Sequence, residues 1–297
     1  MSKRMELGAL VPFTDTGGDP SLVRDFAQTI EAVGYDFLEA PDHVLGGKPT
    51  PGQTIADEMF HDPFVLLGYL SGVTTTLGFS TGVLILPQRQ TALVAKQAAC
   101  LDVLSGGRFR LGIGVGWNPV EFVGLNEDFH NRGRRSEEQV QVMRALWAEP
   151  HITFKGRYHT IDDAGINPRP ASGSVPIWFG GHHEHTLPRI AKWGDGWMPN
   201  AYPPDQTALD IFGQLRRMTE EAGRDPASVG IEVWTSLGDG KEADWREETA
   251  FWKQAGVSHI CVTTTFGRRH HKRIAGKTLA DHLAALKRYH AAIADLL

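Results

Sequence analysis

The sequence predicts an α/β protein whose strands close into a (β/α)8 TIM barrel, with a short hairpin-containing insertion on the C-terminal rim. β-type stretches alternate with helical stretches eight times along the chain, a rhythm typical of a parallel sheet. The length of 297 residues suits one closed barrel of eight such units better than an open sheet or two domains. We therefore expect residues 1–297 to form a single barrel domain, with the insertion at about residues 148–175.

Four strand–helix units are expected in the first half of the chain. Asp19 precedes a helical pattern that has Pro20 at its first position and Gly34 after its end, which indicate a cap, a first turn and a stop. Ser136, with Gln139 three residues on, predicts a capping box at the start of the fourth helix. The strands are expected at residues 5–13, 35–40, 77–86 and 109–115, and the helices at residues 20–33, 63–73, 91–104 and from residue 136.

The second half follows the same rhythm after one long break. Its strands are expected at residues 177–179, 196–198, 231–236 and 259–264, and its helices at residues 186–193, 209–222, 247–255 and 279–296. The break between residues 148 and 176 contains the run Phe-Lys-Gly-Arg-Tyr at 154–158, which predicts a small hairpin inserted on the barrel rim.

Charge and hydropathy exclude several classes of protein. The net charge of -5 and the pI near 6.2 argue against a nucleic-acid-binding surface. No apolar run reaches the roughly 18 residues of a membrane span, and the first residues lack the apolar region of a signal peptide. We expect a cytoplasmic protein whose two cysteines, Cys100 and Cys261, are buried free thiols rather than a disulfide.

The fourth strand has the most informative pattern. Gly112, Gly114 and Gly116 alternate with apolar residues and leave one strand face without side chains, so either a large opposing side chain or a planar ligand ring must fill that volume. Trp117 and Asn118 follow at the barrel mouth, where a ring and an amide suit ligand packing, although tryptophan is also a common core residue. The run is not a Rossmann fingerprint, because it has no third glycine at the right spacing and no helix is expected directly behind it.

Two further strand ends carry candidate residues, because active sites of TIM barrels lie at the C-terminal ends of the strands. Asp42 and His43 follow the second strand, where a carboxylate and an imidazole could orient a substrate and move a proton, or could be a turn aspartate and an exposed histidine. Gly82 interrupts the third strand, which indicates a bulge, a close backbone approach or a simple packing glycine.

The fifth strand ends in Gly180 and Gly181, and a helix follows within a few residues. Free backbone amides at a helix start favour an anion site, to which His182, His183 and His185 would add donors. A zinc site is the alternative interpretation of these histidines. We expect no metal, because the run lacks the H-E-x-x-H spacing and a barrel zinc site would take ligands from several strands.

The last strand is followed by a basic loop, Gly-Arg-Arg-His-His-Lys at residues 267–272. This loop is either a solvated charge run or a contact for an acidic tail on a cofactor or substrate. The sequence contains no Ser-His-Asp signature, no P-loop and no carboxylate pair with an evident acid–base role.

Several of these stretches together resemble one known family. They are Pro-Asp-His at residues 41–43, Thr-Gly-Val-Leu-Ile-Leu-Pro at 81–87, Leu-Ser-Gly-Gly-Arg-Phe at 104–109, Gly-Ile-Gly-Val-Gly-Trp at 112–117, Pro-Ile-Trp-Phe-Gly-Gly at 176–181 and Gly-Asp-Gly-Trp at 194–197. In this order they resemble the bacterial-luciferase-like superfamily of flavin and deazaflavin barrels, most closely its F420-dependent oxidoreductase branch. The resemblance covers most of residues 5–200, and the last third matches only in its periodicity.

The resemblance implies a cofactor ring across the barrel mouth, against a non-proline cis peptide that would here join Gly82 and Val83. It implies that His43 faces the substrate and that Asp42 approaches the polar edge of the deazaflavin. Glu184 departs from the small polar residues of relatives and would repel a phosphate unless it points away. The cofactor-binding residues that it implies are Asp42, Thr81, Gly82, Val83, Gly114, Gly116, Trp117, Asn118, Gly180, Gly181, His182 and His183.

Three functions follow from this resemblance. The first is an F420-dependent oxidoreductase that transfers a hydride between the deazaflavin and a small organic substrate, with His43 moving the accompanying proton. The second is a two-component monooxygenase that uses FMN, and the third is a non-catalytic flavin-binding barrel. A homodimer is expected, with a flavin or F420 reductase as a further partner, and the rim loops at residues 45–58 and 148–176 would select the substrate.

Overall fold

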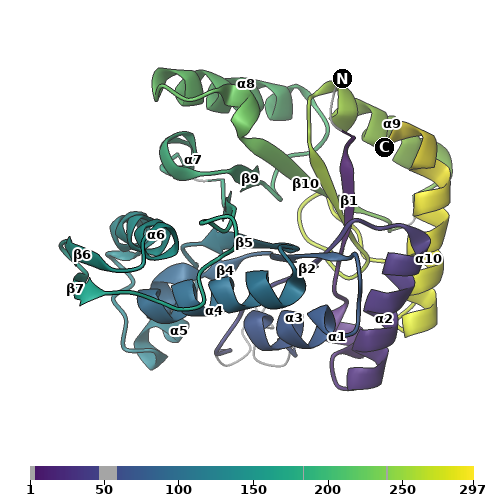
Figure 1. Ribbon diagram of the computed structural model, residues 1–297. Coiled ribbons are helices and arrows are strands. Elements are labelled where there is room, and N and C mark those ends of the chain that lie inside the picture. The colour runs from purple at the N-terminus through teal and green to yellow at the C-terminus, as the bar shows by residue number, and fades with distance from the viewer. Residues whose placement is uncertain (1–3, 47–58, 183, 239) are drawn as a thin grey trace.

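Parallel strands form a closed barrel in the computed structural model, which describes residues 4–46, 59–182, 184–238 and 240–297 (Figure 1). The strands of the barrel are β1 (Glu6–Leu10), β2 (Phe37–Ala40), β3 (Gly78–Thr81), β4 (Leu84–Ile85), β5 (Phe109–Gly114), β8 (Ile177–Gly180), β9 (Gly196–Met198), β10 (Gly230–Ser236) and β11 (His259–Thr263). β3 and β4 both pair with β5 and share one of eight positions, and β1 closes the ring by pairing with β2 and β11. The predicted TIM barrel is confirmed.

Helices surround the strands (Figure 1). They are α1 (Phe13–Thr16), α2 (Pro20–Val33), α3 (Pro63–Ser71), α4 (Thr91–Ser105), α5 (Pro119–Gly124), α6 (Arg132–Ala148), α7 (Thr186–Trp193), α8 (Gln206–Glu221), α9 (Glu242–Gln254) and α10 (Leu279–Ile293). The predicted limits of α2 are confirmed, because the Asp19 side chain accepts a hydrogen bond from the Ser21 amide and Gly34 ends the helix at φ 104°.

Two local predictions about helix starts are wrong. α6 begins at Arg132, four residues before Ser136, and Gln139 does not cap it. The buried Gln139 amide instead donates hydrogen bonds to the carbonyl oxygens of Leu86 and Arg89, so it ties α6 to the segment after β4. The second error is α5, which opens at Pro119, directly behind the β5 glycines where no helix was expected.

The insertion forms the predicted hairpin, with antiparallel strands β6 (Ile152–Lys155) and β7 (Thr160–Ala164). It connects α6 to β8 and projects beside α6, away from the barrel (Figure 1). The Glu138 carboxylate of α6 accepts hydrogen bonds from the amides of Arg157, Tyr158 and His159, and this anchors the turn of the hairpin. The His159 ring also bonds the Thr91 hydroxyl at the start of α4, 2.6 Å away.

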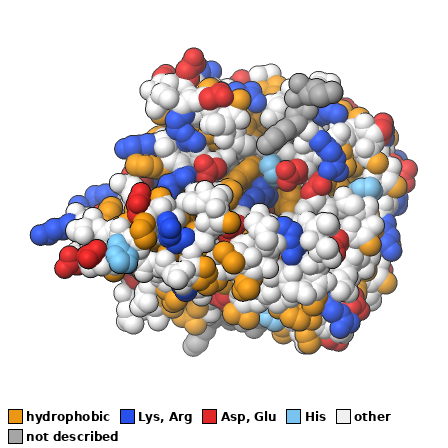
Figure 2. Space-filling view, viewed as in Figure 1, with side chains coloured by type: hydrophobic (Ala, Val, Ile, Leu, Met, Phe, Trp, Pro, Cys, Tyr) orange, Lys and Arg blue, Asp and Glu red, His pale blue; other side chains and the backbone are white. Residues whose placement is uncertain are grey.

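Two predictions from composition also have a structural counterpart. Cys100 and Cys261 are free thiols, as predicted, but only Cys261 is buried, and the prediction that Cys100 is buried is wrong because its side chain is partly exposed. In the part of the chain that is described, no helix has both the length and the apolar character needed to cross a membrane. Acidic and basic side chains are interspersed over the face that Figure 2 presents.

Candidate active site

His43 lies at the barrel mouth, just after β2, where a buried carboxylate holds its ring. Its Nδ1 is 3.3 Å from Oε2 of Glu121, a residue of α5 whose side chain is 0% exposed. Glu121 also accepts hydrogen bonds from the backbone amides of Val44 and Leu45, at 2.9 and 3.4 Å. The carboxylate therefore fixes both the ring and the backbone that follows it.

The charge state of Glu121 follows from these contacts. Burial alone raises the pKa of the Glu121 carboxyl, but hydrogen bonds from His43, Val44 and Leu45 oppose it, and the net pKa is lowered. Glu121 is thus an anion at neutral pH and orients the imidazole with Nδ1 toward it. Among the described residues, Nε2 of His43 has no hydrogen-bond partner, so this nitrogen is left to act on a ligand.

Aromatic rings flank the imidazole. The His43 ring lies edge-on to Phe60, with 5.0 Å between centroids, and to Trp117, with 6.1 Å. Trp117 is 47% exposed, so its ring faces the mouth and is not part of the core. This arrangement gives the histidine an apolar neighbourhood with one open side, which suits contact with a planar or small organic molecule.

A bulge separates β3 from β4. The peptide bond between Gly82 and Val83 is cis, as the family resemblance implies. The Val83 side chain lies against two glycines on neighbouring strands: a Cβ atom on Gly114 would stand 2.5 Å from Cγ2 of Val83, and one on Gly180 would stand 2.7 Å from Cγ1. These two glycines make room for the bulge.

The same contacts decide what fills the bare face of β5. A Cβ atom on Gly112 would stand 1.9 Å from the carbonyl oxygen of Thr81, and one on Gly116 would stand 2.6 Å from Cγ2 of Ile85. Atoms of this chain therefore occupy the space beside the glycines, and the alternative of a ligand ring in that space is wrong. Contact of the cofactor with the backbone of Gly114 and Gly116 stays a prediction.

Three other predicted cofactor ligands already have partners within the chain. Both carboxylate oxygens of Asp42 are bonded, to the Arg89 guanidinium at 2.7 and 3.3 Å and to the Ile85 amide at 3.0 Å. The hydroxyl of Thr81 donates to the Gly112 carbonyl at 2.6 Å. Asn118 caps α5, and its side chain accepts from the amide of the second helical residue at 3.2 Å.

Replacing Asp42 with alanine is expected to lower the free energy of unfolding by about 3 kcal/mol, because it breaks a buried ion pair. Arg89 would keep only Asp62 as a partner, and the Ile85 amide next to the bulge would lose its acceptor. Urea unfolding measures the change. Asp62→Ala is the matched control: Asp62 binds the same guanidinium but is more exposed and caps α3, so its loss should cost about 1 kcal/mol. Unchanged stability of Asp42→Ala with weakened cofactor binding would favour the direct cofactor role instead.

The opposite side of the mouth contains the residues predicted to bind an anion. Gly180 ends β8, and Gly181 follows it with φ 101°, a backbone conformation that glycine adopts readily. The Arg269 guanidinium approaches the same edge, 3.2 Å from Oδ1 of Asn200 and 3.2 Å from Nε2 of His182. The basic loop is therefore not only a solvated charge run. Arg269 of this loop is a residue that the sequence analysis did not assign to the site.

The residues that follow Gly181 were predicted to lie near an anion, and the structure describes some of them. His183 lies outside the described residues. Glu184 is exposed and lies 3.8 Å from His185, also exposed, at the surface. In the same basic loop, His271 is buried, and burial lowers its pKa to about 4, so it is a neutral ring that contacts the Asn200 carbonyl.

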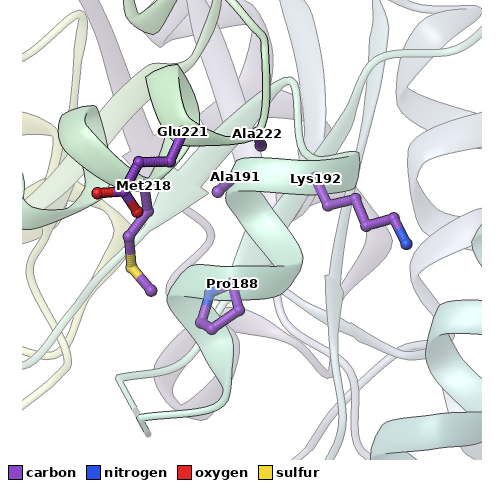
Figure 3. A pocket seen from close by; sticks show the side chains of 6 residues that line it. All are labelled: Pro188, Ala191, Lys192, Met218, Glu221 and Ala222. Atoms are coloured by element: carbon purple, nitrogen blue, oxygen red, sulfur yellow. The ribbon is translucent and has the colours of Figure 1, made fainter.

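A cavity of about 60 Å³ lies at the base of the mouth. Its lining residues are Glu39, Gly82, Val83, Gly180, Gly181, Met198, Asn200 and Trp234. This space is large enough for small molecules such as water and too small for a tricyclic ring. A larger pocket of about 360 Å³ lies away from this site, between α7 and α8 (Figure 3). Its lining residues are Pro188, Ala191, Lys192, Met218, Glu221 and Ala222, and the Lys192 side chain points away from it (Figure 3).

The barrel and the histidine–carboxylate pair at the C-terminal ends of its strands place this chain in the class of TIM-barrel proteins with candidate catalytic residues where the enzymes of this fold have their active sites. The luciferase-like monooxygenase family model matches residues 5–294. The chain therefore belongs to the luciferase-like monooxygenase family and is an oxidoreductase.

Individual relatives differ in their activities. The pyrimidine monooxygenase RutA of Allorhizobium ampelinum is 34% identical over 228 residues, which are 73% of this chain and 61% of that protein. The F420-dependent hydroxymycolic acid dehydrogenase of Mycobacterium tuberculosis is 28% identical over 222 residues, which are 73% of this chain and 59% of that protein. A solved F420-dependent secondary alcohol dehydrogenase, in complex with an F420-acetone adduct, shares the fold with a TM-score of 0.77 at 19% identity, over 98% of this chain and 99% of that one.

Proposed function

We propose that this protein is an F420-dependent oxidoreductase that transfers a hydride between the deazaflavin and a small organic substrate. The observation that carries the proposal is the His43–Glu121 pair at the mouth, which leaves one imidazole nitrogen facing outward. Relatives named as F420-dependent dehydrogenases support the cofactor assignment.

The residues at the mouth fit a planar ring with an anionic tail. The exposed Trp117 and the Val83 bulge offer apolar contacts to a ring. On the far side, Arg269 and His182 offer donors to an anion, beside the positive-φ backbone of Gly181. When bound, the deazaflavin would supply the hydride chemistry, and the protein would supply placement and electrostatics.

His43 then has two tasks. It holds a substrate oxygen by a hydrogen bond at Nε2, and it gives or takes the proton that accompanies the redox change. Glu121 is a positioning residue, because in the described part of the chain its carboxylate bonds only His43 and the backbone of Val44 and Leu45. Phe60 and Trp117 exclude water from the sides of the imidazole.

Titration of the purified protein with F420 and with FMN tests the cofactor. We expect tighter binding of F420, and Arg269→Ala should weaken it about tenfold or more, because a charge-assisted hydrogen bond contributes about 1.5 to 3 kcal/mol. Arg288→Ala is the control, since Arg288 pairs with Glu242 on the outer helices. A clear preference for FMN would replace the proposal with the monooxygenase function that the RutA relative favours.

The wider assignments remain predictions of the sequence. They are a homodimer, a flavin or F420 reductase as a partner, and a cytoplasmic location. The substrate-selecting loop predicted at residues 45–58 lies almost wholly outside the described residues, so the substrate is proposed only as a small organic molecule.

A further inference from the structure

Two glutamates meet inside the barrel, beneath the bulge. Glu39 of β2 and Glu232 of β10 are fully buried, and their carboxylate oxygens and the Cys261 sulfur lie within 4.8 Å of one another. Trp234 donates its indole N–H to Oε1 of Glu39 at 3.0 Å. The Arg110 guanidinium forms an ion pair with Oε2 of Glu232. The cluster thus contains two acids and one permanent cation.

Each glutamate has one oxygen without a partner. Oε2 of Glu39 and Oε1 of Glu232 are buried and accept no hydrogen bond among the described residues. Two buried carboxylates beside one guanidinium would leave one negative charge uncompensated in a medium of low dielectric constant. A single proton between the two free oxygens removes that charge and satisfies both atoms.

The surroundings hold the proton on Glu39. Burial raises the pKa of Glu39 well above its usual range, the charge of Glu232 raises it further, and Arg110 opposes this without reversing it. Burial also raises the pKa of the Cys261 thiol, and burial lowers the pKa of His259. The neighbouring thiol and imidazole are therefore uncharged at neutral pH, and Arg110 and Glu232 are the charged groups that face Glu39.

Arg110 is fixed in this role by aromatic rings. Its guanidinium lies over the rings of Phe37 and Trp178, 4.2 and 4.5 Å from their centroids. Its Nη1 atom is buried and has no hydrogen-bond partner among the described residues. This Nη1 atom can therefore donate a hydrogen bond to Oε1 of Glu232 when the shared proton turns away from Glu232. The guanidinium also disfavours a metal ion between the two glutamates and Cys261.

Glu39 belongs to this cluster and to the cavity at the same time. Its carboxyl lies directly under Gly82, where a Cβ atom would stand 2.0 Å from Oε1, and it lines the cavity of about 60 Å³. We propose that Glu39 and Glu232 share one proton, and that Glu39 is a neutral acid that turns this proton from Glu232 to a small oxygen acceptor when one enters the cavity, with Nη1 of Arg110 then donating to Oε1 of Glu232. The acceptor is a water molecule or an oxygen of the bound substrate. Only the second identification rests on the proposed function.

Infrared difference spectroscopy of the full chain, without cofactor, tests the shared proton. The wild type should show the C=O band of a neutral carboxylic acid at pH 7, and Glu39→Gln should remove it. Glu232→Gln should remove it as well, because Glu39 then becomes the carboxylate partner of Arg110. Glu248→Gln is the matched control: Glu248 is a buried acid of raised pKa outside the cluster, bonded to Thr235 and Trp252, and its loss should leave the Glu39 band in place.

Each outcome decides the proposal. A wild-type minus Glu39→Gln difference spectrum without this band overturns the neutral acid, whatever band Glu248 contributes to both proteins. A band that is lost in Glu39→Gln but survives Glu232→Gln shows a lone buried acid and overturns the sharing. Added Zn²⁺ that removes the band by binding the wild type would replace the proton with a metal site.

Solvent exchange tests the donor role through the cavity. Transfer to D2O should shift the band within minutes, because water in the cavity reaches the acid proton. A band that stays unshifted for hours overturns the donor role. None of these measurements needs a cofactor, so they succeed or fail independently of the F420 titration. If F420 and FMN both fail to bind, the proposed function falls while the result for the proton stands.

Discussion

His43→Ala is expected to lower kcat by about 10² to 10⁴-fold, the usual contribution of a positioned general acid or base. The imidazole is the one titratable group at the mouth that is held by a buried anion and still presents a nitrogen without a partner among the described residues. It touches Phe60 and Trp117 but none of the residues assigned to the anionic tail. The dissociation constant of the cofactor should therefore change little. Steady-state kinetics with a panel of alcohols, imines and activated alkenes, together with a cofactor titration, separates the two effects.

Two variants sharpen this result. His151→Ala removes an exposed histidine of the hairpin insertion and should leave kcat unchanged. Glu121→Gln keeps the shape of the side chain but removes its charge, so kcat should fall about tenfold or more, with an altered pH profile and little change in KM. Full turnover in His43→Ala would remove this residue from the mechanism. A Glu121→Gln enzyme with an unaltered pH profile would reduce Glu121 to a structural role.

Gly112→Ala is expected to destabilise the fold by about 3 kcal/mol, at the upper end of overpacking effects. The added Cβ atom would meet the carbonyl oxygen of Thr81 at 1.9 Å and the Met198 sulfur at 2.8 Å. The first contact is with backbone, which cannot turn aside as a flexible side chain can. Relief requires β3 to separate from β5, where Thr81 also donates its hydroxyl to Gly112. The midpoint and slope of urea unfolding measure the loss.

Gly68→Ala is the control for a glycine without such a neighbour. Gly68 lies inside α3, and nothing would come within 4 Å of its Cβ atom. Alanine should therefore raise stability by up to about 1 kcal/mol through its higher helix propensity. If both variants have the stability of the wild type, the close approach of Thr81 to β5 is not what holds the third strand in place.

Periodicity was enough to predict the barrel. The eight strand–helix units were recognisable because buried parallel strands and amphipathic helices leave different repeats in the sequence. Caps such as Asp19 and Gly34 act within a few residues of their own helix, so local sequence places them well. The hairpin of the insertion was predicted for the same reason, since its turn is a local feature.

The partners of the site residues could not be predicted in this way. Glu121 is 78 residues from His43, on a short helix that the sequence did not reveal. Arg89 is 47 residues from Asp42 and forms an ion pair with the carboxylate that was expected to meet the cofactor. Such pairs depend on which loops meet at the mouth, and one sequence carries no signal for that. Gln139 fitted a local capping motif, but its side-chain amide instead donates a long-range hydrogen bond to the Leu86 carbonyl oxygen.

The glycines of β5 illustrate the limit from another side. The pattern showed correctly that side chains are absent from one face of β5. It could not show that atoms of the neighbouring strand segment fill the space beside that face. These atoms belong to Thr81, Val83 and Ile85. A glycine row thus predicts a close approach more securely than it predicts what approaches.

The seat of Val83 also has a consequence for protein engineering. One side chain, held between Gly114 and Gly180, sets how far the bulge stands into the mouth. Position 83 is therefore a single site at which a substitution would change the depth of the proposed binding floor. In the proposed function, a library at this position, with both glycines kept, would reshape the floor proposed to carry the cofactor while His43 and its carboxylate anchor stay where they are.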